Sequence, residues 1–126
     1  MEINSSDVHA EVTGAFWRYV DALIANDIDI VTTSFWNSEL TLRYGAGENL
    51  YGIAAIAAFR NTQRGRRFEL EVRRLVITTY GRDFGTANCE LVRSDSPHPG
   101  RMSHTWVRFE DGWRIVAAHV SALPVG

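Results

Sequence analysis

The chain has 126 residues, of which 45% are hydrophobic and 22% charged, and this balance is ordinary for one globular domain covering residues 1–126. Its formal net charge of −2 gives no electrostatic reason to expect nucleic acid as a partner. No apolar run is long enough to span a membrane, no signal segment is recognisable, and the single cysteine, Cys89, fits a reducing compartment. The sequence therefore predicts a cytoplasmic protein without a membrane partner.

The first half of the chain predicts three helices and one short strand. Apolar residues recur at helical spacing over residues 5–27, after serines suited to capping a helix. A shorter helix is expected in "DIDIVTTSFW", residues 27–36, and a strand in "ELTLRYG", residues 39–45. The segment "GIAAIAAFRNTQ", residues 52–63, predicts a third helix, whose alanines allow it to lie close to a sheet.

The second half predicts four strands joined by turn sequences, at residues 68–80, 85–93, 101–110 and 113–123. In the first of these, Phe68, Leu70 and Val72 have one parity, whereas Leu75 and Ile77 have the other. This shift indicates either a bulge or burial of both faces. Burial of both faces would suit a sheet that packs on a second copy of the chain, so we expect a homodimer.

Helices followed by an antiparallel meander predict a segregated α+β domain, with three N-terminal helices packed on a curved antiparallel sheet. Such an arrangement forms a cone with an internal pocket. The order and length of the elements resemble the NTF2-like, or cystatin-like, superfamily. That fold carries many unrelated functions, so the site has to indicate which one applies.

Three segments go further than the fold: "RYGAGENLYG" at 43–52, "ITTYGRDFGTAN" at 77–88 and "TWVRFEDGWRIVAAHVS" at 105–121. Together they resemble the AtzH-like family of small NTF2-like proteins, from the first helix to Ser121. That family is associated with bacterial ureide breakdown. One branch belongs to oxalurate catabolism, and another decarboxylates dicarboxyurea after the cyanuric acid ring has been opened.

Arg43 is the first candidate site residue. Strand alternation places it on the same side as Thr41, and an arginine facing an apolar interior is costly without an anion. Its guanidinium matches a carboxylate in bidentate geometry. The residues alone leave open whether that carboxylate is a ligand's or a structural partner such as Glu48 or Asp21. The family resemblance implies a small carboxylate-bearing ligand.

Tyr19 lies on the inner face of the first predicted helix. An isolated tyrosine there is commonly a core aromatic whose hydroxyl finds a backbone partner. Resemblance to the decarboxylase branch implies instead that Tyr19 acts together with Arg43. Glu48 and Tyr51, beside the glycine-rich turn, are expected at the rim of the same pocket.

The final predicted strand supplies further candidates. Alternation puts Ile115, His119 and Ser121 on one side, and this stripe turns polar towards its end, as it would on entering a pocket. His119 could then supply a hydrogen bond or a proton, although a satisfied core histidine is the commoner role. Trp106 is a further candidate for contact with the substrate, and the side of the sheet that it faces stays open.

The four histidines have no metal-ligand spacing, and the glycine-rich turn is not a dinucleotide or phosphate fingerprint. We therefore expect no metal and no organic cofactor. The resemblance implies cofactor-free decarboxylation, or a related cleavage, of a small carboxylated urea such as dicarboxyurea. The alternative is a non-catalytic protein that binds oxalurate-type metabolites or assists an amidase of the same pathway.

Overall fold

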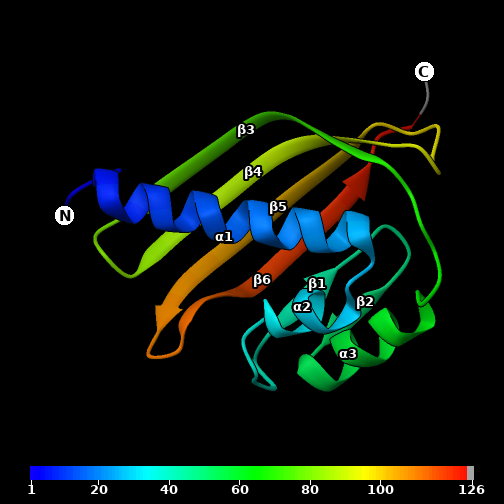
Figure 1. Cartoon of the computed structure of the whole chain (residues 1–126), viewed down its shortest axis with the longest axis horizontal. Coiled ribbons are helices and arrows are strands. Elements are labelled where there is room, and N and C mark those ends of the chain that lie inside the picture. The colour runs from blue at the N-terminus through cyan, green and yellow to red at the C-terminus, as the bar shows by residue number, and fades with distance from the viewer. Residues whose placement is uncertain (125–126) are drawn as a thin grey trace.

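The structure, a computed structural model, describes residues 1–124. Its elements, in chain order, are α1 (Ser6–Ala25), α2 (Ile28–Thr33), β1 (Leu42–Tyr44), β2 (Asn49–Tyr51), α3 (Ile53–Thr62), β3 (Leu70–Tyr80), β4 (Phe84–Arg93), β5 (Gly100–Phe109) and β6 (Gly112–Ala122). Helix α1 lies across one face of a curved sheet, while α2 and α3 gather at one end of it (Figure 1). The predicted α+β cone with three helices before the long strands is confirmed.

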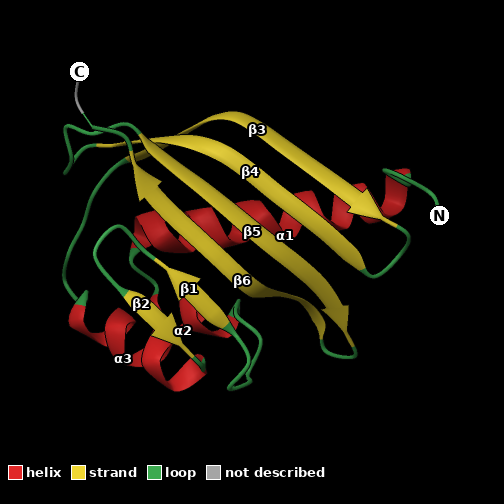
Figure 2. Cartoon of the chain, turned by 180° about the vertical axis from the view of Figure 1, so that it is seen from behind, coloured by secondary structure: helices red, strands yellow, loops and turns green. Residues whose placement is uncertain are grey.

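The six strands form one sheet in the order β2-β1-β6-β5-β4-β3. All neighbours are antiparallel except β1 and β6, which pair in parallel, so the sheet is mixed rather than purely antiparallel. Strand β2 was not predicted, because its glycine-rich surroundings read as a turn. The helices all cover one face, and the other face of the long strands carries no helix (Figure 2).

Helix α1 owes its position to one apolar stripe. Val8, Val12 and Phe16 are buried at four-residue spacing, and Tyr19 continues the stripe one turn later. Burial of each such side chain contributes on the order of 1.5–3 kcal/mol. The helix ends at Asn26, whose left-handed backbone is one that asparagine tolerates. The same stripe therefore fixes the direction in which Tyr19 points.

Two bulges decide which side chains face the helices. In β3 the pairing with β4 shifts between Arg73 and Val76, and Arg74 has φ 53°. This confirms the bulge that the parity of the strand indicated. A second shift, in the pairing of β5 with β6, leaves Val116 as an extra residue between Ile115 and Ala117. The inward and outward faces of β6 therefore exchange at Val116.

Candidate functional site

A cavity of about 210 Å³ lies between the helices and one end of the long strands. The C-terminal part of α1, helix α2, the β1–β2 hairpin and the C-terminal part of α3 line it, together with residues of β3 to β6. Leu23, Val31, Leu91, Met102 and Val120 give it apolar walls. The volume suits a small metabolite, since it is below the range of pockets that hold drug-sized molecules.

Arg43 projects into this cavity from β1 and is only 6% exposed. Its Nη1 donates a hydrogen bond of 2.6 Å to Oε1 of Glu48, and its guanidinium carbon lies 5.3 Å from the centre of the Phe59 ring. The structural partner that the sequence left open is thus present. Glu48 also lines the cavity and is partly exposed, so the ion pair borders the cavity without filling it.

Gly45 makes the room for that ion pair. A Cβ atom at Gly45 would lie 1.8 Å from Oε1 of Glu48 and 2.9 Å from Nη1 of Arg43. Neither distance is compatible with van der Waals contact, so any side chain at this position would displace the carboxylate of Glu48. The glycine-rich turn is therefore needed for the arrangement of charges and not only for the direction of the chain.

Tyr19 lines the cavity beside a second arginine, Arg60 of α3. Burial lowers the pKa of the Arg60 guanidinium; the Tyr19 hydroxyl opposes this shift, and the positive charge of Arg43 adds to it. Arg60 remains cationic at neutral pH, because an arginine begins far above it. Its Nε is buried and has no hydrogen-bond partner within residues 1–124.

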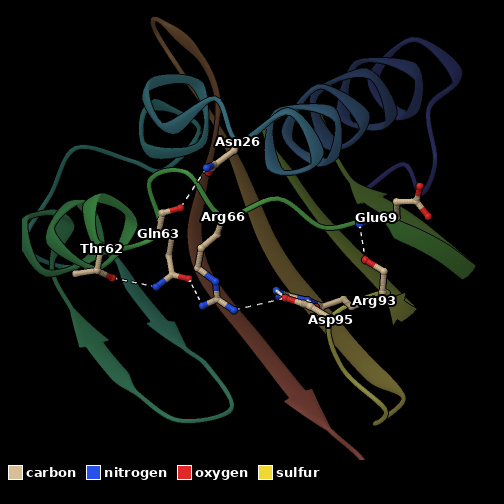
Figure 3. Close-up of polar contacts among 8 residues, drawn as sticks. Asn26, Thr62, Gln63, Arg66, Glu69, Arg93 and Asp95 are labelled. Carbon is tan, nitrogen blue, oxygen red and sulfur yellow. Dashed lines mark hydrogen bonds and ion pairs between the residues drawn. The ribbon is translucent and has the colours of Figure 1, made fainter.

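The segment 63–69, which joins α3 to β3 (Figure 3), contributes Gln63, Arg66 and Phe68 to the cavity lining. The Asn26 amide donates to the carbonyl of Gln63 at 3.1 Å, so the end of α1 holds this segment. Arg66 donates to the Gln63 side chain at 2.7 Å and lies 3.6 Å from Asp95. Arg93 holds the same carboxylate through two hydrogen bonds of 2.8 and 2.9 Å.

The cavity is strongly cationic. Four arginines line it: Arg43, Arg60, Arg66 and Arg93. Among residues 1–124 the carboxylates that pair with them are Glu48, on Arg43, and Asp95, which Arg66 and Arg93 share. Two positive charges are left over, and Arg60 is the arginine of this group for which the described chain supplies no ion pair. Such an excess in an apolar enclosure favours an anionic ligand.

His104 and Trp106 lie in the core next to Tyr19 rather than in the cavity lining. The imidazole of His104 packs edge-on against the Tyr19 ring at 5.1 Å and lies 5.8 Å from the Trp106 ring. Burial, and then the charge of Arg43, lower the pKa of His104 to about 3, so the ring is neutral. The predicted contact of Trp106 with substrate has no support in this placement, since Trp106 is 1% exposed within the core.

Three predicted pocket residues lie elsewhere. The prediction that His119 and Ser121 share a face with Ile115 is wrong, because the bulge at Val116 turns both towards the uncovered face of the sheet. His119 is exposed there, and Ser121 accepts a hydrogen bond from Arg101 at 3.2 Å. Tyr51 is 63% exposed and does not line the cavity, so its predicted place at the rim is wrong as well.

Tyr19, Arg43 and Glu48 thus line one cavity, while sequence reasoning missed Arg60 and His104. Arg60 ends the helical run "IAAIAAFR", where an arginine usually extends into solvent. A signal was available, since Arg60 lies four residues after Ile56, the fully buried residue of α3. His104 alternates with Met102 and Trp106 on an inward face, which could have identified it as a core histidine.

Within residues 1–124, no three histidine, cysteine, aspartate or glutamate side chains come together as a set of metal ligands. No helix in the same range is long and apolar enough to cross a membrane. Cys89 is buried in β4, and burial raises the pKa of its thiol to about 11. A thiol with this pKa is a poor nucleophile at neutral pH.

Comparison with known proteins agrees with the fold. The sequence model of the AtzH-like family matches residues 1–125. A crystallised protein of unknown function from Pectobacterium atrosepticum is 49% identical, with 97% of this chain and 95% of that chain covered at a TM-score of 0.92. A cystatin-like fold protein from Burkholderia xenovorans is 40% identical, with 100% and 99% covered at a TM-score of 0.89.

An NTF2-like superfamily protein from Salmonella enterica is 26% identical, with 97% of this chain and 96% of that chain covered at a TM-score of 0.78. Among proteins of curated function, no match was found. These likenesses establish the family and the fold. The chemistry has to be argued from the cavity itself.

Proposed function

The chain belongs to the AtzH-like family of NTF2-like proteins, and we propose that it is an enzyme of ureide catabolism that removes carbon dioxide from a small carboxylated urea such as dicarboxyurea. The observation that carries this proposal is that a buried arginine, Arg43, and a tyrosine, Tyr19, both line one small cationic cavity. A cation that holds the acid group of the substrate and a proton donor are what such a reaction requires of a protein.

The reaction needs one proton at nitrogen. A urea nitrogen that carries a carboxylate accepts a proton, the C–N bond breaks with its electron pair staying on nitrogen, and carbon dioxide leaves. Tyr19 is the proton donor in this scheme, and its phenolate regains a proton from water. The neighbouring guanidinium of Arg60 stabilises the transient negative charge on the phenolate.

Arg43 binds the carboxylate of the substrate. It can do so because Glu48 engages only its Nη1, while no other hydrogen bond to its side chain is present in residues 1–124. The apolar walls favour the neutral product, because carbon dioxide needs no hydration whereas a carboxylate does. None of these steps calls on a metal or an organic cofactor.

The test is direct assay of the purified protein with freshly prepared dicarboxyurea and with oxalurate, following carbon dioxide release and substrate loss. We expect Tyr19→Phe to lower kcat by about 10²–10⁴-fold with little change in KM. Arg43→Gln should weaken substrate binding at least about tenfold. The matched control is Tyr44→Phe, because the Tyr44 hydroxyl meets only that of Tyr51, outside the cavity.

If the unmodified protein binds oxalurate and leaves both compounds unchanged, the enzymatic proposal fails. The chain would then be a binding or accessory protein for oxalurate-type metabolites, or a partner of a pathway amidase. Equal turnover by Tyr19→Phe and the unmodified protein would remove Tyr19 from the mechanism.

A further inference from the structure

We infer that Arg60 is a second anion-binding residue, and that the cavity selects a small molecule with two acid groups over one with a single acid group. This inference rests on the proposed function in one respect, the binding of one acid group by Arg43. It adds a second binding group for the other end of the ligand, because a single arginine cannot specify both ends. It also separates the two ureides considered above, since dicarboxyurea carries two carboxylates and oxalurate one.

Arg60 lacks the acid partner that each of the other cavity arginines has. Arg43 is paired with Glu48, and the two arginines near the outer part of the cavity share Asp95. Arg60 forms no ion pair within residues 1–124, and its Nε is buried without a hydrogen-bond partner. The buried Nε loses hydration without replacement unless a ligand supplies the acceptor, whereas the Tyr19 hydroxyl serves the rest of the guanidinium.

The position of Arg60 suits two-ended recognition. The guanidinium carbons of Arg43 and Arg60 lie 5.3 and 5.5 Å from the centre of the same Phe59 ring. They are therefore separated by at most about twice that distance, which a molecule of a few atoms between two acid groups can span. Tyr19 lines the same cavity next to Arg60, so its hydroxyl is available to a diacid held at both ends.

Electrostatics leads to the same ligand class. The cavity lining and its bonded carboxylates have two positive charges in excess, and a dianion neutralises them where a monoanion leaves one uncompensated. The penalty for an uncompensated charge is largest at a buried group such as Nε of Arg60, because water screens the charge of Arg66, whose side chain is 59% exposed. Arg60 is therefore the residue that we expect to cause the difference in affinity between dianions and monoanions.

The test compares two probes of nearly equal size, malonate and its half-amide malonamate, by titration calorimetry at constant ionic strength. We expect the unmodified protein to bind malonate at least tenfold more tightly than malonamate. Arg60→Gln should weaken malonate binding about tenfold or more and malonamate binding less than about threefold, so the preference disappears.

Arg64→Gln is the matched control. It removes the same charge close by, but Arg64 is exposed, bonds to Asn61 and does not line the cavity. The preference of the Arg64→Gln variant for malonate over malonamate should equal that of the unmodified protein. Arg60→Lys provides a second variant, retaining the charge without the planar fork, and should keep part of the preference. Melting curves of every variant verify folding.

Equal weakening of both probes by Arg60→Gln, or weakening of neither, overturns the inference. A clear preference for malonate that depends on Arg60, in a protein that turns over neither ureide, would leave this inference standing while the proposed function fails. If the unmodified protein turns over dicarboxyurea but the Arg60→Gln variant still prefers malonate, the proposed function stands and this inference fails.

Discussion

The carboxylate of Glu48 lies 2.6 Å from Nη1 of Arg43, on the same guanidinium that an acid ligand would bind. Glu48 therefore engages one nitrogen of the Arg43 guanidinium and competes with an incoming acid for that cation. We expect Glu48→Gln to raise the affinity for malonate by about three- to tenfold, because it removes the competing charge and keeps the size of the side chain. Titration calorimetry measures the change.

The same variant should be less stable without ligand. Arg43 is 6% exposed, and loss of its charged partner leaves it buried and uncompensated, at a cost of about 1–3 kcal/mol. Saturating malonate should then raise the melting temperature more in Glu48→Gln than in the unmodified protein. Weaker malonate binding in Glu48→Gln would show that Glu48 helps to hold the ligand instead of competing with it.

Gly45 tests the geometry of that ion pair without removing a charge. In Gly45→Ala the new methyl group would meet Oε1 of Glu48 at 1.8 Å, so the carboxylate has to shift from its present contact with Arg43. We expect a loss of about 1–3 kcal/mol in the free energy of unfolding, read from urea titration. Gly47→Ala is the control, since no atom lies within 4 Å of its added Cβ. Equal stability of the two variants would show that the ion pair contributes little.

The sequence was sufficient to predict the fold and the inner part of the site, because these depend on regular patterns. Periodicity over α1 places Tyr19 inward, and alternation in β1 separates Arg43 from Tyr44. Both patterns survive because no bulge interrupts those segments. Of the polar residues in the three family motifs, Arg43 and Glu48 of segment 43–52 line the cavity, whereas Tyr19 lies outside the motifs.

The errors have local physical causes. His119 was assigned to the wrong face because one extra residue, Val116, reverses the alternation of β6, and nothing in a run of apolar residues marks where a bulge occurs. Arg60 was overlooked because its role depends on the cavity that α3 helps to enclose. Strand β2 is only three residues long and gains its pairing from β1, so tertiary context decides it.

The uncovered face of the sheet leads to a prediction about assembly. Val76, Phe84 and Val92 are exposed on β3 and β4, and the outward residues of β4 share the face that the helices leave free (Figure 2). We propose that two copies pack through this face, because exposed apolar side chains on a broad sheet gain by burial. Light scattering should give twice the chain mass at micromolar concentration.

Val76→Arg should shift the dimer towards monomer, because it places a charge within the proposed interface. Leu40→Arg is the control, as Leu40 is a similarly exposed apolar residue in the loop before β1. A monomeric unmodified protein, or a dimer that Val76→Arg leaves intact, would contradict assembly through this face.

His104 makes the stability of the fold depend on pH. Its pKa is lowered from 6.5 to about 3 by burial and by the charge of Arg43, whereas in the unfolded chain it returns to its ordinary value. Between those two values the unfolded state binds a proton that the folded state does not. The free energy of unfolding therefore falls as the pH drops from about 6.5 towards 3, by at most about 1.4 kcal/mol per pH unit.

Urea titrations at pH 7 and pH 5 measure this contribution, which should amount to about 2 kcal/mol for this residue. His104→Phe keeps an aromatic ring against Tyr19 and removes the titrating group, so its loss of stability between the two pH values should be smaller by that amount. His119→Gln, which alters an exposed histidine, should behave like the unmodified protein. An unchanged pH dependence in His104→Phe would mean that His104 is protonated in the folded state at pH 5. It would contradict the conclusion that the ring beside Tyr19 is neutral.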